Sequence, residues 1–519
     1  MDGYDLIVLG SGPGGESVAT QAAKLGAKVA VIEKKMVFGG PTGLSSKAVR
    51  EATKRITAAI DQIGGDRRRQ INRLWKRKFP VLKTEAEAWQ AQETRQRLFK
   101  AGIDLFIGDA ELMAESKGVT QATLRVCRPN GCVSLDSFHI VISTGSRAHK
   151  PNELQPGNVP ITFQKNKVID ATEISTLTAL PNSVVIIGGG VIAVEYATVL
   201  AELSVGVTLI CNESSFLPFL ERDLLRSLKR LMKKNRILIV HLDIENIEIE
   251  DTTGKVKVKM GTDPLRPQKP KRVFTVDTVI YSGGRDANSD NLGLQNVGVV
   301  TAKYGRIKID ENYRTTAETS IYAIGDVIGP PGLASAAVQQ GRYVADKLFG
   351  PQSTAYDEET KRERRIMRTK QEILFGSTKG GGSIDAPLTL WTIPEVSSVG
   401  KNKVQAREVY GEDAQIVEGF GYFKNCARGR LSCDEDGFLK VVARYDSVRN
   451  VHSIIGVHII GEGANELIQL GSCLVHSGAT LEAISNTPFS AVTLSILYQV
   501  AADDALLKSL NAVNENRIM

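Results

Sequence analysis

The fold is decided by residues 4–33, which read YDLIVLGSGPGGESVATQAAKLGAKVAVIE. The apolar run at 4–9 predicts a strand that ends at a glycine-rich turn, and residues 16–25 predict the helix that follows. A second apolar run, at 28–32, predicts another strand, and this strand ends at the acidic residue Glu33. A strand, a tight turn, a helix and a second strand in this order predict a layered α/β fold.

The glycines of the turn have separate physical roles. Gly10 permits the tight turn, Gly12 lets the backbone approach a pyrophosphate, and Gly15 allows the helix to pack closely on the strand. The helix N-terminus presents free N–H groups and a positive dipole end to the phosphates. Glu33 stands where a carboxylate accepts a hydrogen bond from an adenosine ribose hydroxyl. The sequence therefore predicts a dinucleotide site at this turn, which also includes Gly14.

The same pattern returns in the middle of the chain. A strand predicted at 183–187 runs into the turn GGGVIA at 188–193, and a second strand is predicted at 207–210. This second strand is followed by Cys211 instead of an acid. An acid there favours the free 2′-hydroxyl of NAD, and a nearby arginine favours the 2′-phosphate of NADP. Neither signal is clear, so the choice between NAD and NADP stays open.

Three further segments have the pattern of a strand that ends in small residues. They are 140–146 (IVISTGS), 279–285 (VIYSGGR) and 321–326 (IYAIGD), the last followed by LASAA at 333–337 and a predicted helix. Asp326 is a carboxylate at the end of a strand and faces a helix N-terminus, a position that suits a ribitol hydroxyl and its neighbouring phosphate.

Composition places the chain among ordinary globular proteins. Its 519 residues are 42% hydrophobic and 24% charged, with a formal net charge of +7, which excludes disordered, collagen-like and disulfide-scaffold proteins. No apolar run approaches the ~20 residues of a membrane-spanning helix. The six cysteines are too sparse for a disulfide framework and favour a reducing compartment. We expect a soluble, cytoplasmic protein, or an organellar one if a transit peptide has been removed, with no affinity for membranes or nucleic acid.

The order of these motifs resembles the flavoprotein pyridine nucleotide–disulfide oxidoreductases, which include glutathione reductase and dihydrolipoamide dehydrogenase. The resemblance covers nearly the whole chain. It implies two Rossmann-like domains, for FAD and for NAD(P), an α+β interface domain and a homodimer. The implied domains are an FAD domain at 1–150 and 284–350, an NAD(P) domain at 151–283, a charged insertion at 351–386 and an interface domain at 387–519.

The resemblance also implies roles for individual residues. Lys47 matches the lysine beside the flavin, and Glu195 matches its glutamate partner near the nicotinamide; these are the two expected catalytic residues. The residues expected to bind FAD are Gly10, Gly12, Gly14, Gly15, Glu33, Lys47, Thr144, Gly145, Asp326 and Ala334. The residues expected to bind NAD(P) are Gly188, Gly190, Ala193, Glu195 and Gly284. No metal site is expected.

Two departures from the family pattern bear on function. The family carries two cysteines four residues apart after a glycine pair, but residues 39–47 read GGPTGLSSK and contain no cysteine. The family's C-terminal His-Pro-Thr-x-x-Glu matches AVTLSI at 491–496, so its histidine and glutamate are gone. Disulfide chemistry needs a thiolate and a general acid–base, and the sequence predicts neither at the usual site.

Cys127 and Cys132 have the spacing of a redox pair but flank the residues RPNG. We interpret this segment as a hairpin between strands at 123–126 and 133–135, with nothing that places the two cysteines beside the flavin. Whether they pair with each other stays open at this point.

Among the branches of the family, the soluble pyridine nucleotide transhydrogenases resemble this chain most. The likeness runs through ENYRT at 311–315, IYAIGDVIG at 321–329, TIPEVSSVG at 392–400 and FKNCAR at 423–428. It implies FAD-dependent hydride transfer between NADPH or NADH and NAD(P)⁺, without a redox-active disulfide.

Two other functions stay open. The turn at 41–44 is shorter than in the family, which favours an NAD(P)H-dependent flavin reductase, or diaphorase, acting on a quinone, oxygen or a protein acceptor. The basic run at 67–78, interpreted as a solvated helix face, and the insertion at 351–386, with a charged helix expected at 357–374, favour a flavin-binding scaffold with degenerate catalysis and a protein partner.

Overall fold

The computed structural model describes residues 3–40, 44–60, 66–114, 122–129, 131–262, 267–268, 270–317, 320–350, 386–432 and 435–518. The chain divides into two compact units. Unit 1 comprises Met1–Ala52, Leu74–His149 and Gly284–Ile384, and unit 2 comprises Thr53–Arg73, Lys150–Gly283 and Asp385–Met519. The charged helix predicted at 357–374 lies outside the described residues.

Unit 1 is built on a seven-stranded sheet in the order β3-β2-β1-β6-β5-β4, with β19 paired to β6. Strands β1, β2, β3 and β19 run parallel to their neighbours, whereas β4, β5 and the first half of β6 form an antiparallel meander. The strands are β1 (Tyr4–Leu9), β2 (Val29–Glu33), β3 (Asp104–Ile107), β4 (Asp109–Leu112), β5 (Ala122–Arg128), β6 (Gly131–Ile142) and β19 (Ile321–Ala323). A small ribbon pairs β7 (Ser146–Ala148) with β18 (Arg285–Ala287).

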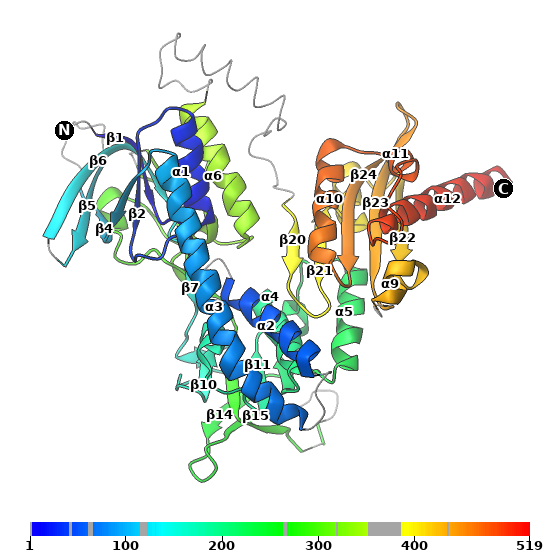
Figure 1. Cartoon of the computed structure of the whole chain (residues 1–519), viewed down its shortest axis with the longest axis horizontal. Coiled ribbons are helices and arrows are strands. Elements are labelled where there is room, and N and C mark those ends of the chain that lie inside the picture. The colour runs from blue at the N-terminus through cyan, green and yellow to red at the C-terminus, as the bar shows by residue number, and fades with distance from the viewer. Residues whose placement is uncertain are drawn as a thin grey trace. The chain divides into compact units, whose positions relative to one another are not determined.

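The continuous apolar run of β1 is explained by burial on both faces of the sheet. Leu6 and Val8 join a core beneath α1 (Pro13–Lys24) and α6 (Ala334–Phe349), which lie side by side (Figure 1). Ile7 and Leu9 point the other way, into a second core. A strand buried on both faces reads as an unbroken apolar run because neither face meets water.

Two long helices contribute residues to both units. They are α2 (Leu44–Ile60) and α3 (Arg67–Lys100), and α3 continues through Pro80. Unit 1 also contains three short 3₁₀ turns. In the chain, η3 (Leu294–Val297) and η4 (Lys303–Gly305) come before β19, and η5 (Gly325–Ile328) lies between β19 and α6.

The basic run at 67–78 lies in α3, and the interpretation of this run as a solvated face is wrong for two of its residues. Trp75 is only 1% exposed and stacks on Phe79 with ring centroids 4.4 Å apart. Arg68 donates hydrogen bonds to the backbone carbonyls of Leu203 and Ser204, at the C-terminal end of α4, and to those of Leu180 and Pro181. Helix-end carbonyls lack intrahelical partners, so this guanidinium acts as a cap. The remaining basic residues of the run, Arg67, Arg69, Arg73, Lys76, Arg77 and Lys78, are exposed.

Unit 2 contains a five-stranded parallel sheet in the order β10-β17-β11-β12-β13. Its strands are β10 (Val168–Asp170), β11 (Ser183–Ile187), β12 (Gly206–Ile210), β13 (Leu238–Val240) and β17 (Thr278–Tyr281). Its helices are α4 (Val191–Glu202) and α5 (Arg222–Lys234), with η1 (Ala171–Thr176) and η2 (Glu213–Ser215) between strands. An antiparallel sheet of β14 (Ile244–Ile249), β15 (Val256–Met260) and β16 (Val273–Val276) packs into the same core, and β8 (Glu153–Leu154) pairs with β9 (Val159–Pro160).

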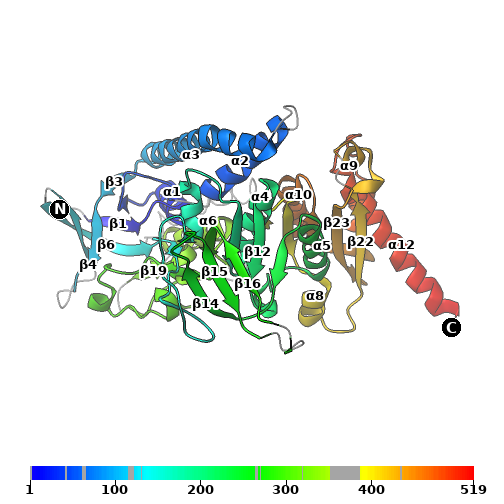
Figure 2. The same ribbon diagram turned by 90° about the horizontal axis from the view of Figure 1, so that it is seen from below.

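The C-terminal part of unit 2 is a five-stranded antiparallel sheet, β20-β21-β24-β23-β22, covered by helices. The strands are β20 (Leu388–Leu390), β21 (Val396–Gly400), β22 (Ile416–Tyr422), β23 (Phe438–Asp446) and β24 (Val451–Ile460). The helices are α8 (Lys403–Tyr410), α9 (Ala427–Leu431), α10 (Ala464–Ser477), α11 (Leu481–Ser485) and α12 (Ile496–Ile518), with η6 (Phe423–Asn425). The C-terminal end of α12 extends beyond the sheet (Figure 2).

The α/β fold class with two nucleotide-binding units and an α+β C-terminal part is confirmed. The C-terminal helix, α12, begins at Ile496, after the turns formed by residues 491–495. Among the described residues, no helix is long and apolar enough to cross a membrane.

Candidate functional site

The first glycine turn has the geometry that its sequence predicts. The N–H of Gly10 donates to the carbonyl of Ile32 at 2.8 Å, which ties the turn to the end of β2. A Cβ on Gly15 would lie 1.9 Å from the carbonyl oxygen of Gly10, so only glycine allows α1 to approach the strand this closely. Gly12 is the N-cap of α1, and a Cβ placed there would have no atom within 4 Å. The helix N-terminus therefore faces open space.

Glu33 is held at this turn by specific hydrogen bonds. Its Oε2 accepts from the backbone N–H of Ser11 at 2.9 Å and from the Ser11 hydroxyl at 2.6 Å. The Ser11 hydroxyl in turn accepts from the N–H of Gly39 at 3.1 Å. The carboxylate is thus fixed at the carboxyl end of β2, beside the helix N-terminus. Ser11 was not among the predicted residues, although its place between two glycines of the turn was a usable signal.

Asp326 lies in η5, directly after β19, and belongs to a cluster of polar side chains. Its Oδ2 accepts from the Ser146 hydroxyl at 2.7 Å, and that hydroxyl also accepts from Nε of Arg285 at 2.7 Å. Arg285 Nε lies 3.9 Å from the Asp326 carboxylate. Sequence reasoning missed Ser146 and Arg285 as site residues, although Arg285 directly follows a glycine pair.

The remaining predicted FAD residues lie near this cluster or begin helices in unit 1. The Thr144 hydroxyl donates to the carbonyl of Asn288 at 2.7 Å, and the carbonyl of Gly145 accepts from the N–H of Asn288 at 2.9 Å. Ala334 is the first residue of α6. The start of α6 is close to α1, because the Ser17 hydroxyl donates to the carbonyl of Val338 at 2.8 Å. Gly14 is buried in the first turn of α1.

The second glycine turn repeats the geometry of the first. The N–H of Gly188 donates to the carbonyl of Ile210 at 2.9 Å. Gly188 has a φ of +133°, and a Cβ there would lie 2.5 Å from the carbonyl oxygen of Ser282. Gly190 is the N-cap of α4 and faces open space, as Gly12 does, and Ala193 is fully buried against the sheet. Gly284 lies in unit 1, although it was expected among the NAD(P) residues, and its carbonyl accepts from the N–H of His149.

Glu195 is buried in the first half of α4, with 4% of its surface exposed. Its Oε1 accepts a hydrogen bond from the backbone N–H of Trp391 at 2.8 Å. One turn later on the same helix, the Thr198 hydroxyl accepts from the N–H of Ile393 at 3.2 Å. The segment that follows β20 is therefore fastened to α4 at two points. Sequence reasoning missed this contact because it joins backbone groups almost 200 residues from the helix in sequence.

Lys47 lies in α2, where its Nζ is 3.4 Å from the hydroxyl of Ser46. Lys47 belongs to unit 1 and Glu195 to unit 2, so their pairing stays a prediction.

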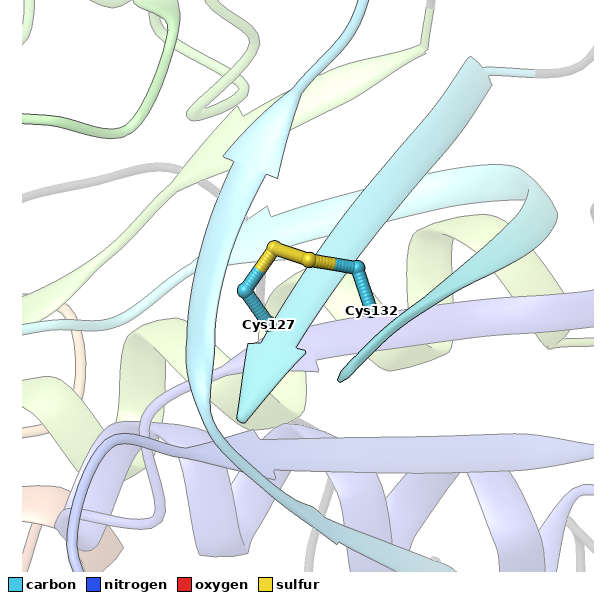
Figure 3. Close-up of a disulfide and its surroundings, with 2 residues drawn as sticks. All are labelled: Cys127 and Cys132. Carbon is cyan, nitrogen blue, oxygen red and sulfur yellow. A yellow bond between two sulfur atoms is a disulfide. The ribbon is translucent and has the colours of Figure 1, made fainter. Parts of the chain in front are cut away.

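Cys127 and Cys132 form a disulfide across the hairpin of β5 and β6 (Figure 3). The hairpin itself is confirmed, and each strand is longer than predicted. Cys132 lies at the start of β6, whereas the turn at 143–145 follows the end of that strand. Ten residues of extended strand correspond to roughly 33 Å of chain. The other described cysteines, Cys211, Cys426 and Cys473, are free thiols.

No group of three or more His, Cys, Asp or Glu side chains able to hold a metal ion occurs in the part of the chain that the structure describes.

Comparisons with known proteins agree with this geometry. Residues 4–341 match the family model described as pyridine nucleotide-disulphide oxidoreductase, and residues 386–501 match its dimerisation domain. The chain is 31% identical over 516 residues to a protein of Pseudomonas aeruginosa named soluble pyridine nucleotide transhydrogenase, with 97% of this chain and 98% of that protein covered. A protein of the same name from Stutzerimonas stutzeri is 32% identical over 517 residues, with the same coverage of both chains.

Solved structures share the fold. LpdA from Mycobacterium tuberculosis has a TM-score of 0.75 at 21% identity, with 96% of this chain and 98% of that chain covered. The HOCl-induced flavoprotein disulfide reductase RclA from Escherichia coli, as its Cu(II) complex, has a TM-score of 0.72 at 23% identity, with 97% and 99% covered. The family match over most of the chain, together with relatives aligned end to end, decides the assignment. The chain belongs to the pyridine nucleotide-disulphide oxidoreductase family and is an NAD(P)H-dependent flavoprotein oxidoreductase of the kind that uses FAD.

Proposed function

We propose that the protein is a pyridine nucleotide transhydrogenase, which transfers a hydride between NADPH or NADH and NAD(P)⁺ without a redox-active disulfide. One observation carries the proposal: two complete dinucleotide turns, at 10–15 and 188–193, occur in a chain that lacks the family's thiol machinery at 39–47 and 491–496. The name of the full-length relatives supports the same reaction.

The residues at the two turns fit the two nucleotides. Gly12 and Gly190 leave space at a helix N-terminus that a side chain would fill and that a pyrophosphate can occupy. We assign Glu33 to the ribose of FAD and Asp326 to its ribitol, as acceptors of hydrogen bonds from their hydroxyls. When bound, FAD supplies a carrier that accepts a hydride from one nicotinamide and delivers it to another.

The protein's own contribution is position and charge. The Trp391 N–H orients the Glu195 carboxylate, which we place near the nicotinamide. We place Lys47 beside the flavin, where its positive charge would stabilise negative charge on the reduced ring. No side chain has to relay a proton to a leaving thiol, which is why the missing histidine and cysteines are compatible with this reaction.

In this proposal the Cys127–Cys132 disulfide takes no part in catalysis. Its position at the start of β6, far along the strand from the turn at 143–145, supports that assignment. The matched dimerisation domain supports a homodimer. A cytoplasmic location completes the proposal.

The experiment that tests the function is anaerobic reduction of thio-NAD⁺ by NADPH with flavin-loaded protein. Rapid turnover with parallel lines in double-reciprocal plots is the expected result, because the two nucleotides react in alternation. Loss of the flavin absorbance without thio-NAD⁺ reduction would contradict transhydrogenation and would favour the second candidate. If NADPH leaves the flavin absorbance unchanged, the chain is a flavin-binding scaffold.

The second candidate is an NAD(P)H-dependent reductase of a quinone, oxygen or a protein acceptor. The sequence at 41–44 is shorter than in the family, and residues 41–43 lie outside the described part of the chain. Fewer residues there would leave room for a bulkier acceptor, which favours this candidate. A protein partner would dock through residues 351–386. Deleting residues 355–375 tests this docking: loss of a salt-sensitive partner in pull-downs supports it, and an intact dimer with full activity and unchanged partners contradicts it.

A further inference from the structure

The two nucleotide turns share a common register, which makes their residues comparable one by one. In the first, Leu9 is paired with Ile32 and the N–H of Gly10 donates to the Ile32 carbonyl. In the second, Ile187 is paired with Ile210 and the N–H of Gly188 donates to the Ile210 carbonyl. The residue after Ile32 is Glu33, and the residue after Ile210 is Cys211. Cys211 therefore occupies the position in the second turn that Glu33 occupies in the first.

Cys211 carries no charge at this position. Its side chain is 8% exposed, and burial raises the pKa of the thiol to about 11, so the thiol is neutral at pH 7. A carboxylate at this position would accept from a ribose 2′-hydroxyl and repel a 2′-phosphate. A neutral thiol does neither.

The charged groups around Cys211 are balanced between the two signs. Glu213, two residues further on, is 79% exposed at its side chain and lies 3.9 Å from Nζ of Lys229. Lys229 also lies over the ring of Phe216, 5.0 Å from its centroid. From the end of β13, Nδ1 of the exposed His241 donates to the carbonyl of Cys211 at 2.9 Å. Glu213 and Lys229 therefore place one negative and one positive charge near Cys211. Together they do not strongly favour or disfavour a 2′-phosphate.

We propose that Cys211 removes discrimination at the adenosine 2′ position, so that NAD(H) and NADP(H) bind alternately at the one turn formed by residues 188–193. This inference rests on the proposed function, since a transhydrogenase with a single exchanging site must admit both nucleotides there. Glu213 and Lys229 set the small preference that remains.

Binding of ADP-ribose and of 2′-phospho-ADP-ribose tests the inference. These probes differ only at the 2′ position and cannot reduce the flavin, so calorimetry on the flavin-loaded protein reports binding alone. We expect the two Kd values to lie within about tenfold, because Glu213 and Lys229, two described charged side chains near Cys211, are of opposite sign. A difference above about a hundredfold in either direction would overturn the inference.

Substitution of Cys211 supplies the direct test. In Cys211→Glu the ratio of the two Kd values should shift on the order of tenfold or more against the 2′-phosphate, as expected for a new like charge. The matched control, Cys211→Ser, keeps a small neutral side chain and should leave the ratio within about twofold. An unchanged ratio in Cys211→Glu contradicts the inference.

A second variant covers the case in which Cys211→Glu does not fold. Glu213 is largely exposed, so Glu213→Lys should fold and should tighten 2′-phospho-ADP-ribose by about tenfold with little effect on ADP-ribose. No change in either Kd would place the 2′ group elsewhere and overturn the inference. Comparable Kd values without transhydrogenation would overturn the proposed function alone, whereas transhydrogenation with Kd values a hundredfold apart would overturn this inference alone.

Discussion

The carboxylate of Glu195 accepts a hydrogen bond from the backbone N–H of Trp391 at 2.8 Å. Glu195 lies in α4, the helix that follows the second nucleotide turn, and Trp391 lies in the segment that follows β20. This contact fixes one oxygen of a buried carboxylate in the helix whose N-terminus we assign to NAD(P).

The variant Glu195→Gln tests the role of the negative charge of Glu195 apart from the role of its hydrogen bond to Trp391. The Gln side chain keeps an oxygen that can accept from Trp391, so the geometry should survive while the negative charge is lost. We expect reduction of the flavin by NADPH, measured by stopped flow, to slow by on the order of 10²-fold, the effect of removing one preorganised electrostatic group. Glu202→Gln, at the last residue of the same helix, is the control and should leave the rate unchanged. An unaltered rate in Glu195→Gln would remove this residue from the mechanism.

Substitution of the buried Lys440 should have a large effect on stability. It is 2% exposed, and its Nζ lies 3.1 Å from Glu221, 2.8 Å from Asp223 and 2.7 Å from Glu418. In Lys440→Met three carboxylates would face one another without a cation, which should lower the free energy of unfolding by about 3–5 kcal/mol. Lys234→Met, at a lysine whose side chain is 70% exposed and paired with Asp436, should cost at most ~1 kcal/mol. Urea denaturation measures the free energy of unfolding of both variants, and equal losses in Lys440→Met and Lys234→Met would contradict the prediction.

The same cluster predicts a pH dependence. Hydrogen bonds and charge from Asp223, Glu418 and Glu221 outweigh burial and raise the pKa of Lys440 above its ordinary value of 10.5. A raised pKa in the folded state means that this lysine stabilises the fold fully below pH 10.5 and loses that contribution as the pH rises through the folded value. Between pH 8 and about 10, titration of Lys440 should therefore not lower the free energy of unfolding of the wild-type protein. A decrease in this range that is present in the wild type and absent in Lys440→Met would show that the lysine titrates lower than the geometry requires.

Arg68 is expected to stabilise unit 2 through its contacts with four backbone carbonyls. Arg68→Met removes the donor to these carbonyls, three of whose contacts with Arg68 are part-buried, and we expect a loss of about 2–3 kcal/mol in the free energy of unfolding. Arg69→Met, one residue along and exposed, should change it by less than ~0.5 kcal/mol. Thermal unfolding of the Arg68→Met and Arg69→Met variants tests this prediction. Equal melting temperatures would contradict it and would support the interpretation of the basic run as a solvated helix face.

Much of the fold was predictable because its signals are local. Each nucleotide turn is a contiguous stretch in which strand, glycines and helix lie within about 30 residues, and the positions of Gly10, Gly15, Gly188 and Ala193 followed from spacing alone. The contacts of Arg68 and Glu195 were not predictable, because their partners are backbone groups distant in sequence that carry no pattern of their own. Trp75 was interpreted as part of a charged face because the basic residues around it hide an apolar series, Ile71, Trp75 and Phe79, at helical spacing.

The disulfide between Cys127 and Cys132 can be tested for stability and for activity with one double variant. Cys127 and Cys132 close a short loop, with a sequence separation of 5, so chain entropy predicts a stabilisation of about 2 kcal/mol. We expect the double variant Cys127→Ser and Cys132→Ser to lose about that much stability and to keep its rate of thio-NAD⁺ reduction within about twofold.

The most direct test of the central claim is a comparison of acceptors. NADPH would be offered thio-NAD⁺ or an oxidised dithiol substrate under anaerobic conditions, with the wild-type protein and with the double serine variant. We predict rapid reduction of thio-NAD⁺ by both proteins and no reduction of the disulfide substrate by either. Reduction of the disulfide by the wild-type protein, lost in the serine variant, would contradict it and assign catalysis to Cys127 and Cys132.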